Sequence, residues 1–119
     1  MSDEIHFDPT AIDKLRHLGG EKFVGDMIAL FFQYAPQRLE AARSAAGAGD
    51  LQAVARAVHA LKSSAGQIGA RQVQDLAARI EKLATENQAE GAKALLSSLE
   101  VAITQVKPLL EATRNPASP

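Results

Sequence analysis

Apolar residues recur along this chain at intervals of three and four, the spacing of one face of an α-helix. The pattern predicts five helical segments with short connections between them. The first begins after an Asp8-Pro9 cap and stops at Gly19-Gly20, and the second covers residues 21–46. The third covers residues 51–68 behind an Asp50 cap, the fourth ends near Asn87, and the fifth covers residues 91–113.

The second segment carries the widest apolar stripe. Its predicted line is Phe23, Met27, Leu30 and Tyr34, widened by Val24, Ile28 and Phe31. We expect this helix to supply most of the core and to be kinked at Pro36. The residues predicted to be buried in the other helices are Leu51, Val54, Val58, Leu61, Val73, Leu76, Ile80, Leu99, Ile103 and Val106.

Short connections make successive helices antiparallel neighbours. The predicted fold is therefore all-α: an antiparallel up-down-up-down four-helix bundle, with a short extra N-terminal helix across one end. We expect residues 1–114 to form one helical domain and residues 115–119 to be a flexible C-terminal tail.

Composition narrows the class further. The chain has 119 residues, which suits one domain, and its 13 basic and 14 acidic residues leave a net charge of −1. A general nucleic-acid binder would be strongly basic, so no nucleic-acid partner is expected. There is no cysteine, no apolar run long enough for a membrane span, and no metal-ligand spacing among the three histidines. We expect a cytoplasmic protein that contacts no membrane and holds no metal.

His59 is the residue that departs most from this plain pattern. It lies on the third segment, well away from the apolar stripe, so it is expected to face solvent. Its neighbours on that side are the small residues Ala55, Ser63 and Gly66, which leave the imidazole open to another protein. Arg56 and Lys62 lie one turn to either side and could neutralise an anion on the ring. An ordinary exposed histidine between two solvated bases is the alternative.

The sequence around His59 then favours one family. Residues 59–70 read HALKSSAGQIGA, which closely resembles the signature of histidine-containing phosphotransfer (HPt) domains. The Phe7-Asp8-Pro9 start, Pro36 in the second segment and the Gly49-Asp50 turn also lie where that family places them. Ser63 follows the lysine where many members have glycine, and because serine is small we expect access to be preserved.

The resemblance implies a phosphocarrier, with no ATP site of its own. His59 would carry a phosphoryl group and exchange it with an aspartate of a receiver (response-regulator) domain, and a sensor or hybrid histidine kinase would feed the relay. Lys62 would stabilise the phosphoryl charge. No cofactor is expected on this chain, since the Mg²⁺ ion belongs to the receiver. The expected docking surface is made of Ala55, Arg56, Ser63, Gly66 and Gln67, with Phe7 and Ile12 as its apolar edge.

The resemblance also points to Glu81 on the next helix, as a possible acceptor that orients the imidazole. The alternative is a solvated residue paired with Lys82 or Thr85. For the whole protein, the alternatives are a helical-bundle adaptor that binds signalling proteins without being phosphorylated, a scaffold, and a module of a larger kinase. We expect a monomer, because a receiver needs the His59 face free.

Overall fold

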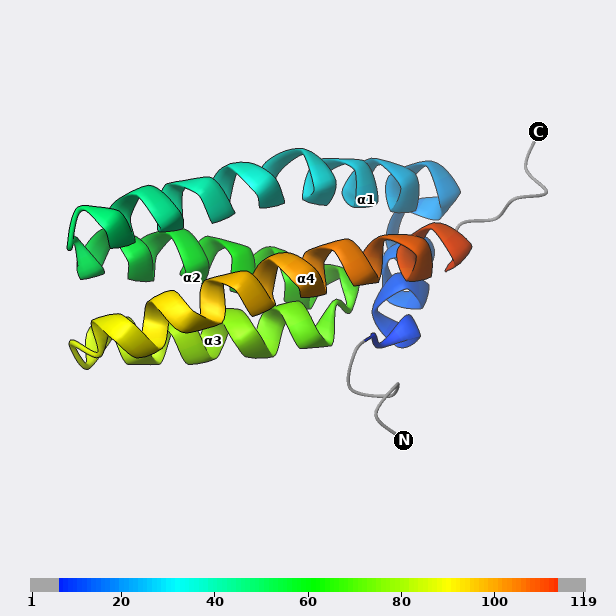
Figure 1. The fold of residues 1–119 in the computed structure, drawn as a ribbon. Helices are drawn as coiled ribbons and strands as arrows, with labels where there is room; N and C mark the ends of the chain where they lie inside the picture. Colours follow the sequence, from blue (N-terminus) through cyan, green and yellow to red (C-terminus); the bar gives the residue numbers. More distant parts are fainter. Residues whose placement is uncertain (1–6, 114–119) are drawn as a thin grey trace.

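The computed structural model describes residues 7–113, and within them it contains four α-helices and no strand. These are α1 (Pro9–Gly47), α2 (Leu51–Ile68), α3 (Arg71–Thr85) and α4 (Ala89–Thr113). Each packs against its neighbour in sequence, and α1 also packs against α4, so the helices form a closed antiparallel bundle (Figure 1). The predicted fold is confirmed. The tail predicted for residues 115–119 lies outside the described residues.

The predicted first and second segments are two arms of α1. The backbone leaves helical geometry at Gly20 (φ 82°, ψ −174°), where the chain turns sharply. The first arm, residues 9–19, crosses the end of the bundle, and the second runs along it (Figure 1). Pro36 neither ends nor splits the second arm, because Gly20 is the one interior position of α1 with non-helical dihedral angles.

The crossing arm is fastened to the end of α2. The Asp8 side chain caps the arm by accepting a hydrogen bond from Thr10 N (3.0 Å), and Asp8 N donates to the carbonyl of Gly69 (2.8 Å). Gly69 is the left-handed C-cap of α2 (φ 79°). A Cβ at that position would lie 2.2 Å from the Asp8 carbonyl oxygen, so only glycine fits there. At the other end of the arm, Arg16 donates to the Thr113 carbonyl of α4 (2.7 Å).

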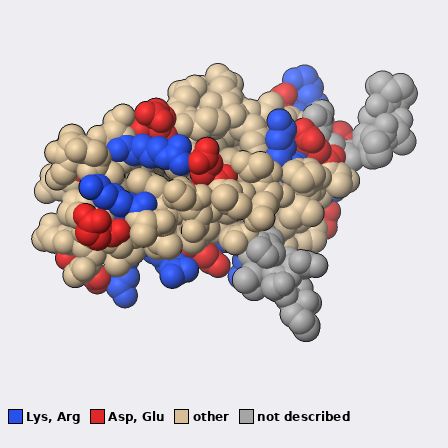
Figure 2. All heavy atoms as spheres, viewed as in Figure 1, with Lys and Arg blue, Asp and Glu red and all other residues tan. Residues whose placement is uncertain are grey.

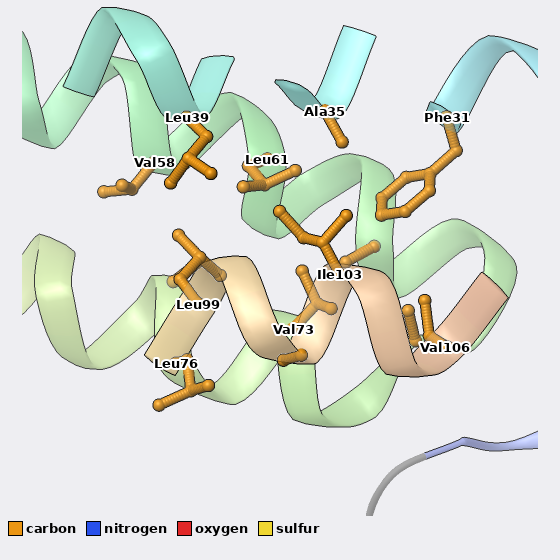
Figure 3. Close-up of a cluster of buried hydrophobic side chains, with 14 of the residues drawn as sticks. Phe31, Ala35, Leu39, Val58, Leu61, Val73, Leu76, Leu99, Ile103 and Val106 are labelled. Carbon is orange, nitrogen blue, oxygen red and sulfur yellow. The ribbon is translucent and has the colours of Figure 1, made fainter. Parts of the chain in front are cut away.

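Side chains from all four helices meet in one apolar core (Figure 3). Nine of the ten residues predicted to be buried in the later helices are buried, and Leu51 at the start of α2 is half-buried instead. The helix begins at Leu51, at the open end of the bundle, so its side chain is covered from one side only. Over the described residues no charged or polar side chain is buried.

The predicted central line of the second segment is wrong, but the three residues predicted to widen it, Val24, Ile28 and Phe31, are buried. The core side of the second arm continues from them through Ala35, Leu39 and Ala42. Leu30 and Tyr34 are each 44% exposed, while Phe23 and Met27 are partly buried at the edge. Alanines at positions 35 and 42 continue the core line, and the larger Leu30 and Tyr34 lie on the outer side of the helix.

The surface carries charges of both signs. On the side where α3 and α4 face the viewer, basic and acidic side chains are interspersed among uncharged ones (Figure 2). Among the described residues no helix is long and apolar enough to cross a membrane.

Candidate functional site

His59 lies in the middle of α2 and faces solvent. The buried side of the helix is formed by Val54, Val58, Leu61, Ala65 and Ile68. The His59 side chain points the other way and is 59% exposed. Its predicted exposure is therefore confirmed, and one edge of the ring is open to a partner protein.

Glu81 of α3 binds His59 at Nδ1, the ring nitrogen that faces α3. Its Oε2 lies 2.8 Å from His59 Nδ1, and its Oε1 accepts a hydrogen bond from Lys62 Nζ at 2.7 Å. The Glu81 side chain is only 23% exposed. One carboxylate on α3 thus binds both of the α2 residues singled out in the sequence, and the alternative pairing with Lys82 or Thr85 is not what the structure shows.

The charge of Glu81 fixes the hydrogen on the imidazole. Partial burial raises the pKa of Glu81, but the hydrogen bonds from Lys62 and His59 outweigh it and hold the pKa below the ordinary value. An ionised carboxylate can only accept hydrogen bonds. His59 Nδ1 must therefore carry the hydrogen, which leaves the lone pair of the neutral ring on Nε2.

Lys62 contacts the same carboxylate as the ring. The sequence puts its ammonium within one turn of His59, where it is expected to neutralise an anion on the ring. In the structure it is bound to Glu81, and its side chain is 32% exposed. Arg56, the other predicted cation, is exposed one turn earlier on α2 and borders a hollow with Ala55 and Thr85.

The small residues predicted to keep the docking surface accessible are only partly exposed to solvent. Ser63 is exposed, but Ala55 is half-buried, and Gly66 is half-buried beneath the side chain of Gln74 from α3. Gln67, the larger residue predicted for the same surface, is exposed. A Cβ at Gly66 would lie 2.8 Å from Gln74 Nε2. Glycine at this position therefore serves packing between α2 and α3 as well as access to the surface.

The apolar edge beside the site comes from α1, which the sequence analysis missed. Gln67 lies between two hollows, one bordered by Leu30 and Tyr34 and the other by Leu18 of the crossing arm, and Met27 borders both. A signal was present, since apolar residues occupied both sides of the stripe in this helix. The sequence did not say which side the core would take.

The apolar edge predicted from Phe7 and Ile12 is wrong. Ile12 is 1% exposed, because the crossing arm turns it into the core. Phe7 is half-buried and borders a different hollow, with Gln72 of α3 and Leu109 of α4. Within residues 7–113 there is no cluster of side chains suited to hold a metal ion.

The fold and the exposed, carboxylate-bound imidazole together define a class of helical-bundle modules that present a histidine to other proteins. A profile of the Hpt domain family matches residues 26–115, and the chain belongs to that family. Hpt domain proteins are phosphocarriers and not kinases, and this chain is a histidine phosphotransfer protein of phosphorelays.

A solved structure shares the fold over almost its whole length. Histidine-containing phosphotransfer protein B (HptB) from Pseudomonas aeruginosa PAO1 matches with a TM-score of 0.84 at 23% sequence identity. The match covers 92% of this chain and 94% of that chain. A comparison with curated proteins found no match.

Proposed function

We propose that His59 is the phosphoaccepting residue of this chain and that the phosphoryl group is bonded to Nε2. The observation that carries the proposal is the hydrogen bond between His59 Nδ1 and Glu81 on an otherwise exposed ring. It supports an imidazole whose outer nitrogen has a free lone pair and whose orientation is fixed before a partner arrives.

Transfer to and from His59 needs few other groups on this chain, because phosphoryl transfer depends mainly on positioning and charge stabilisation. The partner that fits is a receiver domain, whose aspartate and Mg²⁺ ion complete the reacting group, and a sensor or hybrid histidine kinase feeds the relay. Lys62 shares the Glu81 carboxylate with the ring, and its ammonium is the cation that neutralises the phosphoryl oxygens when they are present. In this proposal the partners supply both the nucleotide site and the metal ion.

The docking surface is the outer side of α2 together with the neighbouring edge of α1. Its α2 residues are Ala55, Arg56, Ser63, Gly66 and Gln67. The structure adds Leu30 and Tyr34, two exposed apolar side chains that border the same hollow as Gln67 and Ser64. Apolar side chains beside an exposed reacting group suit a transient protein interface. The protein acts as a cytoplasmic monomer, with this surface free.

The test compares two exposed histidines. Receiver domains labelled on their aspartate with radioactive phosphate are mixed with wild type, His59→Gln and His17→Gln, and acid-labile, base-stable label is followed onto the protein. Wild type and His17→Gln should be labelled, and His59→Gln should not. All three should give the same helical circular dichroism, because both histidines are exposed. Label that persists in His59→Gln refutes the assignment, and an unlabelled wild type favours the non-phosphorylated adaptor.

A further inference from the structure

Phosphorylation changes what Glu81 binds. In the resting protein Glu81 accepts from the Nδ1–H of a neutral imidazole. With a phosphoryl group on Nε2 and a hydrogen on Nδ1, both ring nitrogens are substituted and the ring is cationic. That cation can lose the Nδ1 proton to water. The proton lies between the ring and the Glu81 carboxylate, so Glu81 is the residue that decides how readily it leaves.

We propose that Glu81 keeps the phosphoryl group on His59 transferable by retaining the Nδ1 proton of the phosphorylated ring. The inference rests on the proposed role of His59. In the transfer step an aspartate oxygen of the receiver bonds to phosphorus and the bond between phosphorus and Nε2 breaks. The electron pair of that bond returns to Nε2 and the proton stays on Nδ1. The ring leaves as neutral imidazole, and no proton is exchanged with solvent.

Loss of the Nδ1 proton would block this route. The leaving group would then be an imidazolate anion, which is a far stronger base and a poorer leaving group. A carboxylate suits the task because it has no hydrogen to donate. If the ring gave up its proton, a lone pair on Nδ1 would face a negatively charged oxygen across about 2.8 Å. The protonated ring instead gains a charge-assisted hydrogen bond.

The surrounding charges make this role necessary. The other charged residues within one turn of His59 or Glu81 on α2 and α3 are all basic: Arg56, Lys62, Arg79 and Lys82. Cations nearby favour loss of the ring proton. Glu81 opposes them in direct contact with the ring, and its hydrogen bond from Lys62 turns the nearest of these cations onto the carboxylate. Lys62 also keeps Glu81 ionised, which preserves it as an acceptor.

The substitution Glu81→Gln removes the negative charge of Glu81 while it keeps the shape of the side chain. The glutamine keeps the length of the side chain and an acceptor oxygen, but its amide can rotate and donate to an unprotonated Nδ1. It therefore has no preference between the two ring states. Asp75→Asn is the matched control, because Asp75 is an exposed carboxylate on the same helix, six residues from Glu81. It removes the same charge from α3 without touching the ring.

Phosphoramidate, which phosphorylates imidazole without docking, loads all three proteins. Transfer to a fresh receiver is then timed from about pH 6 to about pH 9, and ring protonation is followed by ¹⁵N NMR. For Glu81→Gln we expect the midpoint of both profiles to fall by about one pH unit, which makes transfer about 10-fold slower on the alkaline side. Asp75→Asn should follow wild type, with equal circular dichroism throughout.

The outcomes separate the two proposals. If all proteins are loaded on His59 and Glu81→Gln has the same midpoints as wild type, Glu81 does not control the proton and the inference is wrong. A lower rate at every pH with unchanged midpoints also overturns it, since that result describes a purely orienting residue. If wild type is not loaded on His59 at all, it is the proposed function that fails.

Discussion

Replacing Gly69 by alanine tests how the crossing arm is attached to the bundle. Gly69 has a φ of +79°, which costs a residue with a Cβ about 1–2 kcal/mol. The new Cβ would also lie 2.2 Å from the Asp8 carbonyl oxygen and 3.0 Å from Ala11 Cβ. The arm must move away, which breaks the bond from Asp8 N to the Gly69 carbonyl, worth about 0.5–1.5 kcal/mol. We expect Gly69→Ala to lose about 1.5–3.5 kcal/mol of unfolding free energy, the sum of the two costs.

Gly49→Ala is the control that isolates the contact. Gly49 has nearly the same φ (+75°), but nothing lies within 4 Å of its added Cβ. It should lose only the conformational cost of about 1–2 kcal/mol. Urea unfolding of both variants measures the difference. Equal losses of unfolding free energy would refute the reasoning, because they would show that the arm can move away from the new Cβ without a loss of stability. The arm borders the hollow next to Gln67, so Gly69→Ala should also weaken receiver binding while phosphoramidate still labels the protein.

Three further predictions concern the site. Lys62→Ala should keep the fold and slow phosphoryl transfer only partly, since the partner's metal ion still neutralises charge; Lys93→Ala, on exposed α4 surface, should transfer like wild type. Leu30→Asp should weaken receiver binding measured by titration calorimetry, and Leu109→Asp, at a leucine of similar exposure (44% and 42%), should not. Partial burial raises the pKa of Glu81, but hydrogen bonds from Lys62 and His59 lower it overall, so its stabilisation is full above the ordinary value of 4.5 and is lost as pH falls through the folded value. The stability gap between wild type and Glu81→Gln should therefore close as the pH falls below 4.5 in urea unfolding, and a gap that widens there would contradict the lowered pKa of Glu81.

The features that the sequence predicted well are local ones. Asp8 and Asp50 each cap a helix by accepting from a backbone N–H two or three residues on, and such caps depend on a few neighbouring residues. The same holds for Gly69 at the end of α2, which matches its predicted end at Ile68. The exposure of His59 also followed from one helix alone, because the apolar side of α2 is narrow and His59 lies away from it.

The features that it predicted badly depend on how helices face one another. In the second arm of α1 apolar residues spread over much of the circumference, so the pattern allowed several rotations, and packing chose the one that leaves Leu30 and Tyr34 exposed. Gly66 was interpreted as open surface because the Gln74 side chain that covers it comes from another helix. The pairing of Lys62 with Glu81 also depends on the second helix, because the lysine side chain has several rotatable bonds and the carboxylate determines where its ammonium lies.

Glu81 could be found from the sequence because the turn between α2 and α3 is short. Pairing across the hairpin is centred on Ala70: His59 lies eleven residues before it and Glu81 eleven residues after it. Gly66 and Gln74, four residues to either side, are in contact as well. Ala70 is fully buried and the Gly69 carbonyl accepts from Asp8 N of the crossing arm, so a slip of the register would break both contacts. One residue inserted in this turn would rotate α3 by about 100° and carry Glu81 away from the ring. His59 and Lys62 share one carboxylate because the short turn between α2 and α3 sets the register of the two helices. The crossing arm binds this turn, so it contributes to the site although it does not contact His59.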